Sequence, residues 1–473
     1  MADSPAPEAR DAVPGAGEAG SPVLISHHGA ASIFVHGIWL VLSVAALGLV
    51  LRYGVNAPFI DDFLVVPVLA GEEPISLEWL WRQHSDHRFP LVKLVIWGAT
   101  AGCGGDFRAV MVLNAAGLSA ASLILIRAAR VLRGRTEFAD AFFPVLLLHW
   151  GHAGNMLRCV IVEDVLIALF LSLLLLRVAG MRSAETRVDL LVLGTCLAGC
   201  SLLGTPGLVL GTSLAPWGLF RARWLLRSSP GPRPPGGAWA LLALGVPLLV
   251  GAAYFLGFER IPHPPLGESL PGVPRFVAQA IGGAFGSLGV FGWGGEGFGA
   301  GWPPLPAILA VAFTLATLAL LFRRLWRRAE DPVRTAWLLA FPLSLLLLAA
   351  AMGFGRAGFG ETYAIRGHYM LRMVPLMAGL YLAWEVLGQA PLARLVQTSL
   401  LAATLSVLAF NMQSGFQQAR DHRVLMDDFS RDLREGMDDD AILRRYCPAV
   451  YPFPEPLRDY LRMMRRGRVA PFR

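Results

Sequence analysis

Long apolar runs alternate with short polar segments between residues 33 and 412. A helix needs about 18 to 20 predominantly apolar residues to cross the ~30 Å hydrocarbon core of a bilayer. Most of these runs approach that length, so we expect an all-α polytopic membrane protein with about eleven membrane-spanning helices. They are predicted at 33–51, 107–132, 138–150, 160–178, 189–203, 207–224, 238–258, 305–322, 335–354, 370–387 and 395–412.

Two further apolar segments, 89–102 and 273–291, do not fit as spans. The first is short and the second is rich in glycine. Counting either one would also place a later arginine cluster on the outer side. We expect both to be juxtamembrane or re-entrant helices, which the membrane tolerates only where protein or a polar cavity surrounds them.

Arginine placement predicts how the chain is oriented. With a cytoplasmic N-terminus, the five cytoplasmic linkers hold four, three, four, five and one arginines, whereas the outer loops after residues 150, 258 and 354 hold one, two and two. Cytoplasmic loops carry the excess of Lys and Arg in membrane proteins. The C-terminus, the first loop at 52–106 and the Gly-rich loop at 259–304 are therefore expected outside.

Composition supports this class of protein. The chain has 473 residues, of which 55% are hydrophobic and 16% charged, against about 25% charged in a typical soluble domain. The net charge of +7 comes from arginines at the ends of apolar runs, so we expect the lipid bilayer and no nucleic acid as a partner. The five cysteines show no metal or redox spacing. The predicted location is the plasma (inner) membrane.

Three regions follow from these patterns. Residues 1–32 are rich in Pro, Ala and Gly and are predicted to be a disordered cytoplasmic tail. Residues 33–412 form the membrane domain. Residues 413–473 are polar, carry twelve arginines, and are expected to form an extracytoplasmic tail with two short helical stretches.

The first outer loop contains an acidic pair, Asp61 and Asp62. One hypothesis is that a partly desolvated carboxylate at the mouth of the bundle acts as a general base toward a sugar hydroxyl. The alternative is that one aspartate caps the N-terminus of a short helix, for which Asp is a preferred residue. The two are compatible, because one side chain can cap while its neighbour faces the site.

The same loop carries the sequence HSDHR at 84–88. On a helix, His84, His87 and Arg88 would share a face and could contact a phosphate or pyrophosphate. A divalent cation held with Asp86 is a weaker alternative, because His-x-x-His alone supplies too few ligands. We predict no metal site and no cofactor; polar helix-surface packing is the third interpretation.

Ionisable residues also stand at the outer entrance of the fourth span, namely Arg158, Glu163 and Asp164. Such residues at the edge of a span are functional candidates. The alternative is that they pair with interfacial water and lipid head groups.

The outer entrance of the tenth span carries a second cluster. Arg366, Tyr369 and Arg372 would share a helix face and could bind a phosphate at the membrane surface through the arginine fork. Snorkelling of the arginines toward the membrane surface is the competing interpretation.

The order of these features resembles the GT-C superfamily of integral-membrane glycosyltransferases. The acidic pair Asp61-Asp62 precedes the segment HSDHRFPLVKLVIW, and a span that ends in an arginine cluster follows. The segments at 158–164 and 366–369 and an outside C-terminal tail are also similar to that group. The resemblance covers the architecture of the whole chain, and its motifs are most specific between residues 55 and 110.

The resemblance implies an inverting transfer of a sugar from a polyprenyl-phosphate donor to a hydroxyl of an envelope lipid, glycan or protein. Asp61 would be the general base, with Asp62 as the second choice. Arg366, with Arg158 or Arg88, would stabilise the departing phosphate, and the active site would face the periplasm or exterior.

Two other functions are compatible with the sequence. The chain could transport or flip a lipid-linked envelope precursor, although no repeated halves are evident and the charges gather at the outer surface rather than at the midplane. It could also be a non-catalytic membrane assembly subunit whose outer loop binds a partner.

Overall fold

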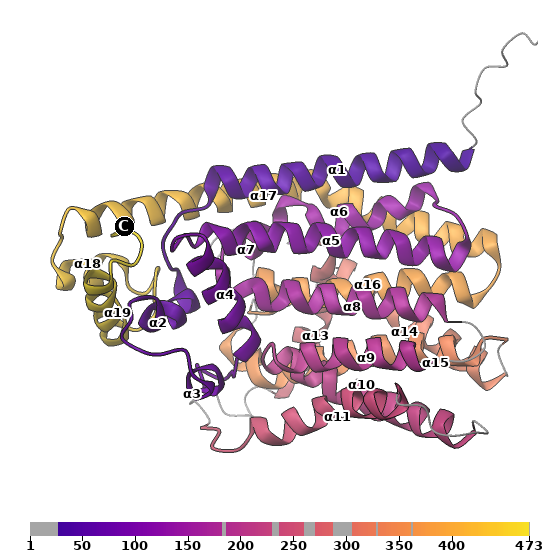
Figure 1. Ribbon diagram of the computed structural model, residues 1–473. Coiled ribbons are helices and arrows are strands. Elements are labelled where there is room, and N and C mark those ends of the chain that lie inside the picture. Colours follow the sequence, from indigo (N-terminus) through magenta and orange to yellow (C-terminus); the bar gives the residue numbers. More distant parts are fainter. Residues whose placement is uncertain are drawn as a thin grey trace, which may run out of the picture.

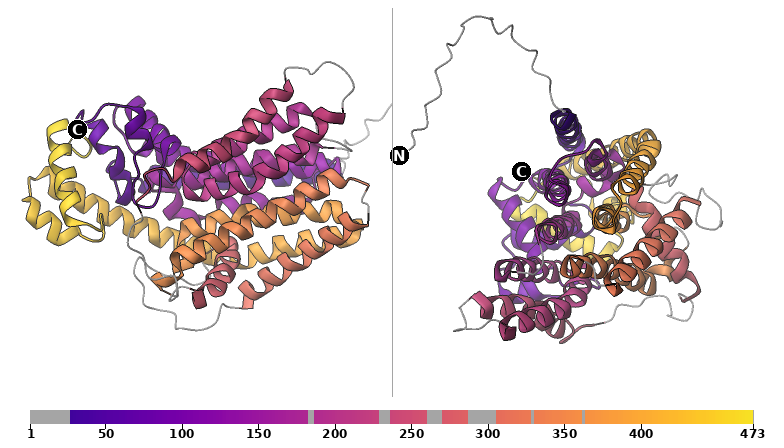
Figure 2. Two further views of the ribbon diagram at one scale, coloured as in Figure 1. Left: turned by 90° about the horizontal axis from the view of Figure 1, so that it is seen from below. Right: turned by 90° about the vertical axis from the view of Figure 1, so that its right-hand side faces the viewer.

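The computed structural model describes residues 27–181, 186–228, 236–259, 270–286, 305–327, 330–360 and 363–472. Its long helices run roughly parallel to one another and form a bundle (Figures 1 and 2). They are α1 (His27–Tyr53), α5 (Arg108–Arg133), α8 (Val162–Gly180), α9 (Arg187–Ser201), α10 (Thr205–Ser228), α11 (Gly236–Tyr254), α14 (Leu305–Trp326), α15 (Pro332–Arg356), α16 (Gly367–Leu387) and α17 (Ala390–Arg434).

Short helices connect these elements. The first loop holds η1 (Ile60–Val65), α2 (Val66–Leu69), α3 (Leu77–Trp81) and α4 (Pro90–Gly102). Between α5 and α8 lie η2 (Phe138–Ala141), α6 (Phe142–Leu148), η3 (Trp150–His152), α7 (Ala153–Met156) and η4 (Cys159–Ile161). The remaining short helices are η5 (Leu270–Gly272), α13 (Val273–Gly282), η6 (Gly283–Phe285), η7 (Ala357–Phe359), η8 (Tyr363–Ile365), α18 (Asp439–Tyr446) and α19 (Pro454–Gly467).

Seven helices of the described chain are long and apolar enough to cross a membrane: α1, α5, α8, α14, α15, α16 and α17. The protein is therefore an all-α, multi-pass membrane protein, as expected. The larger number of eleven spans stays a prediction. Helices α9, α10 and α11 lie at three of the other predicted spans and pack against one another, but the segment 138–150 is divided among η2, α6 and η3.

The two apolar segments that were not counted as spans do form short helices. Helix α4 has 13 residues and α13 has 10, which at 1.5 Å per residue is too short to cross a bilayer. Much of the predicted Gly-rich loop, at 260–269 and 287–304, lies outside the described residues.

Two predicted boundaries differ from the structure. Residues 27–32 are helical, so α1 begins earlier than the end of the predicted tail, while 1–26 lie outside the described residues. Helix α17 runs without a break past residue 412 to Arg434. Its sequence turns from apolar to charged without a proline, and Gly415 lies within the helix, so the helix continues although its surroundings change.

The C-terminal segment packs against the first loop at one end of the bundle, which we call the loop end (Figure 1). The Ile60 N–H donates to the Val450 carbonyl at 2.9 Å. The ring of Phe63 lies 5.3 Å from that of Tyr451 and 5.4 Å from that of Tyr460. A Cβ at Gly467 would lie 2.4 Å from Ala70 Cα, so this approach requires glycine.

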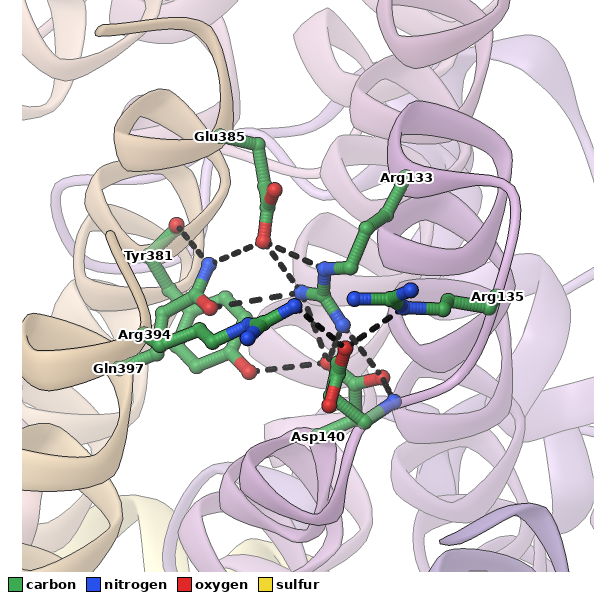
Figure 3. A network of polar contacts seen from close by, with 8 residues as sticks. Arg133, Arg135, Asp140, Tyr381, Glu385, Arg394 and Gln397 are labelled. Carbon is green, nitrogen blue, oxygen red and sulfur yellow. Dashed lines mark hydrogen bonds and ion pairs between the residues drawn. The ribbon is translucent and has the colours of Figure 1, made fainter. Parts of the chain in front are cut away.

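A buried ionic network joins α5, η2, α16 and α17 (Figure 3). It lies where α5 ends, at the opposite end of the bundle from the loop end (Figure 1). Arg133 donates to Glu385 at 2.6 Å and to Asp140 at 3.1 Å. Tyr381 also donates to Asp140, at 2.8 Å, and Gln397 to Glu385, at 2.6 Å. Each buried charge thus has a partner, which such groups require in a low-dielectric setting.

Candidate functional site

Asp62 is fully buried, and its carboxylate accepts hydrogen bonds from backbone N–H groups. Its Oδ1 accepts from the Val160 N–H at 2.7 Å, and its Oδ2 accepts from the N–H groups of Cys159 at 3.2 Å and Phe59 at 3.3 Å. These N–H groups lie at the starts of η4 and η1. Burial raises the pKa of Asp62 to about 6, against the opposing effects of the Val160 N–H and the Arg158 charge. Asp62 therefore follows the capping alternative and ties two segments together.

Asp61 lies in a different environment from its neighbour, with a side chain that is 40% exposed. Its Oδ1 lies 3.2 Å from His84 Nε2, and no described residue hydrogen-bonds its Oδ2. Burial favours a higher pKa, but the His84 hydrogen bond and the charges of His84, Arg158 and His87 hold the pKa of Asp61 below its ordinary value. Asp61 is thus an ionised carboxylate with one open oxygen.

The HSDHR segment forms a tight turn, not the helix considered above. The His84 and His87 backbones exchange two hydrogen bonds, of 2.8 and 3.0 Å. Ser85 at the tip has φ of +51°, in the left-handed region that non-glycine residues rarely adopt. The turn directs the two imidazoles to different partners, because His84 reaches Asp61 whereas His87 reaches Thr205.

His87 is a neutral imidazole. Its Nδ1 lies 2.9 Å from Thr205 Oγ1, at the first residue of α10. Burial lowers the pKa of His87 to about 3, and the positive charges of Arg372 and Arg356 add to this shift, against Asp86 and Asp61. A neutral ring brings no positive charge to a phosphate, which disfavours the predicted anion-binding role of His87.

Arg88 is occupied by backbone carbonyls. Its guanidinium donates to the carbonyls of Trp81 at 2.7 Å, Tyr254 at 2.9 Å, Leu256 at 2.9 Å and Gly257 at 3.1 Å. The side chain is 6% exposed. Arg88 thus fastens the first loop to the end of α11 and is not open to a phosphate.

The other three predicted phosphate-binding residues lie near the same end. Arg158 is half-buried, and its charge acts on both aspartates of the acidic pair. Arg366 is exposed at the start of α16, with its Cζ 3.8 Å from the centre of the Tyr363 ring. Tyr369 is buried, with its ring 5.8 Å from that of Tyr363. The charges of Arg158 and Arg366 both act on His368, so the two arginines border a common region.

Pairs of charges between distant segments complete the site, and the sequence did not predict them. Arg356 of α15 forms an ion pair with Asp86 of the turn. Arg372 of α16 binds Asp164 at 2.5 Å and Glu163 at 3.4 Å, both in α8. Single charges in apolar spans indicate that partners must exist, but the choice of partner depends on which helices are neighbours.

The turn does not gather its side chains around a common cation. Asp86 is paired with Arg356, while His84 and His87 contact Asp61 and Thr205. In the described part of the chain, no three His, Cys, Asp or Glu side chains form a group that could hold a metal ion.

The arrangement offers an open, ionised carboxylate oxygen at the edge of a bundle whose arginines lie nearby. Such a carboxylate can accept a proton from a hydroxyl group, and arginines can stabilise a developing negative charge.

Comparison of the chain with models of protein families, with curated proteins and with solved structures finds no match in any of the three. The resemblance to GT-C glycosyltransferases therefore rests on the residues and motifs of the sequence and stays a prediction.

Proposed function

We propose that the protein is an inverting glycosyltransferase of the GT-C type that uses a polyprenyl-phosphate-linked sugar. The acceptor is a hydroxyl of an envelope lipid, glycan or protein, and the loop end faces the outside of the plasma membrane. One observation carries the proposal: Asp61 is ionised, has one open oxygen, and is held by His84 beside Arg158.

In this mechanism Asp61 Oδ2 accepts the proton of the acceptor hydroxyl, while the oxygen of that hydroxyl attacks the anomeric carbon of the donor sugar. The bond between that carbon and the phosphate oxygen breaks, and the phosphate leaves with the bonding electrons. A single displacement inverts the anomeric configuration. Phosphate is a good leaving group, so the protein needs cations more than a strong general acid.

The structure changes which residues we assign to the phosphate. Arg158 and Arg366 are retained, because the charge of Arg158 acts on Asp61 and the charges of both arginines act on His368. His84 becomes the partner that orients Asp61. Arg88, His87 and Tyr369 are removed from this role, since the first binds carbonyls, the second is neutral and the third is buried among aromatic rings.

The proposal is tested by supplying membranes that contain the protein with radiolabelled polyprenyl-phosphate hexoses and pentoses. Label should pass to an envelope fraction, and the product should have the opposite anomeric configuration to the donor. Retention of configuration, or no transfer from any donor, would contradict the proposal.

A second candidate function, transport of a lipid-linked precursor, is favoured by the broken segment between α5 and α8. His149 and His152 are both buried there, with their rings stacked 4.4 Å apart. Neither ring nitrogen of His149 has a partner among the described residues. Broken helices with buried polar groups are typical of transporter sites. Movement of a labelled lipid-linked sugar across proteoliposomes, without transfer to an acceptor, would support this function.

A further inference from the structure

The site contains polar atoms that the proposed phosphate contacts leave unused. Near Gly204 and Thr205, His87 Nε2 and Glu163 Oε1 have no hydrogen-bond partner among the described residues. An ionised phosphate oxygen only accepts hydrogen bonds. A sugar hydroxyl both donates and accepts, so it can pair with either atom.

One ring nitrogen of His87 is already paired. Its Nδ1 lies 2.9 Å from Thr205 Oγ1, which also contacts the Asp86 carbonyl and the Tyr254 hydroxyl. The other nitrogen, Nε2, has no hydrogen-bond partner among the described residues, on a side chain that is half-buried. A neutral imidazole carries one N–H and one lone pair, and a sugar hydroxyl can pair with either.

Glu163 presents a similar unpaired polar atom. Its Oε2 contacts Arg372 at 3.4 Å, while its Oε1 is buried and has no hydrogen-bond partner among the described residues. A buried polar atom left without a partner is costly. The atom lies against Gly204, where a Cβ would be 2.7 Å from it, so the absence of a side chain at residue 204 makes room for Oε1.

His87 Nε2 and Glu163 Oε1 belong to side chains that lie close to the same residues. Gly204, which touches Glu163 Oε1, is followed by Thr205, which binds His87. The Phe89 ring contacts both groups: it lies beside Gly204, and its centre is 4.9 Å from the centre of the His87 ring. The charge of Asp61 acts on both His87 and Glu163.

We propose that His87 Nε2 and Glu163 Oε1 bind hydroxyl groups of the sugar, and that they determine which sugar the site accepts. This inference rests on the proposed function, because it assigns the sugar-binding half of the same site. Arg158 and Arg366 bind the phosphate, whereas His87 Nε2 and Glu163 Oε1 bind the sugar that the phosphate carries.

Two ligands separate these halves in a binding experiment on the purified full-length protein. The first is farnesyl phosphate, which has no sugar. The second is farnesyl phosphate linked to a hexose or pentose, taking from mannose, glucose, galactose and arabinose the sugar that wild type binds most tightly. The ratio of the Kd for farnesyl phosphate to the Kd for the sugar conjugate increases with the contribution of the sugar. The difference in phosphate charge between the two ligands is the same for wild type and variants, so a change in the ratio reports on the sugar.

Two substitutions change these two atoms with little change in side-chain shape. His87→Phe keeps a ring against Phe89 but loses both nitrogens. In Glu163→Gln the amide oxygen can still face Arg372, which places an N–H₂ donor where Oε1 was. The controls are His36→Phe in α1 and Glu78→Gln in the first loop, whose side chain is 86% exposed.

Each site variant should lower the Kd ratio about tenfold and leave the Kd for farnesyl phosphate unchanged, which also shows that the variant is folded. The controls should keep the wild-type ratio. An unchanged ratio in both variants would overturn the inference, as would an equal loss of affinity for both ligands. If wild type binds neither ligand, the proposed function itself fails, which is a distinct result.

Discussion

Two identical neighbouring side chains have different roles in this protein. Asp62 is buried and accepts three backbone N–H groups, whereas Asp61 contacts His84 through one oxygen and leaves the other open. The sequence predicts both roles for an Asp-Asp pair. It could not assign them, because the donors to Asp62 come from residues 159 and 160, nearly a hundred positions away.

His84 should set the pH dependence of the reaction. It lowers the pKa of Asp61 through a hydrogen bond and its charge. The base is active only when ionised, that is, above its pKa. His84→Gln weakens both effects, so the pKa rises and the acidic limb of kcat/KM moves to higher pH. The measurement is the pH profile of transfer for wild type and variant, with His36→Gln as control. An acidic limb that stays in place would contradict the assigned role of His84.

Asp62→Ala should destabilise the protein, because it leaves three buried N–H groups without their acceptor. Each unsatisfied donor costs roughly 1–3 kcal/mol, so we expect a clearly lower melting temperature in detergent. The matched control is Asp61→Ala, which removes the same group from a half-exposed position and should change the melting temperature much less. Equal effects of the two substitutions would show that Asp62 is not the structural member of the pair.

At the scale of elements, the ionic network around Arg133 should hold the other end of the bundle together. Arg133→Met leaves Asp140 and Glu385 without their cation. Removing one partner of a buried ion pair costs about 3–5 kcal/mol, so we expect a large loss of thermal stability. The double variant Arg133→Met with Glu385→Gln should recover part of that loss, because it removes one of the uncompensated charges. A single variant as stable as wild type would contradict the structural role of the network.

Element positions were largely predictable and their interruptions were not. The apolar runs correspond to the long helices because membrane-spanning helices need continuous apolar length. The predicted span 138–150 is instead divided, and Trp150–Gly151 packs tightly against Gly415 of α17. The sequence of the run does not identify this contact, because its partner is a glycine more than 250 residues away.

At the scale of the whole molecule, the C-terminal segment supports the site. Helix α19 packs on α2, and the rings of Tyr451 and Tyr460 enclose Phe63, two residues after Asp61. The sequence predicted both the first loop and the tail on one side, from arginine placement. It did not predict their contact, because neither segment carries a pattern that identifies the other.

Gly467→Val should loosen this contact, because a side chain at residue 467 would overlap Ala70. We expect faster amide hydrogen exchange in residues 60–70 and a reduced rate of transfer. The control is Gly436→Val, at a position in the tail with nothing within 4 Å, although its φ of +79° adds local strain. Unchanged exchange in residues 60–70 of the Gly467 variant would show that the first loop does not depend on the tail.

The most direct test of the central claim compares Asp61→Asn with Asp62→Asn in sugar transfer, expressed per amount of folded protein. Both substitutions remove one negative charge, but only Asp61 has an open oxygen. We predict that Asp61→Asn reduces transfer at least 100-fold, the lower range for loss of a general base, while its melting temperature stays near that of wild type. Folded Asp62→Asn should retain most of its activity. Full transfer by Asp61→Asn would contradict the account.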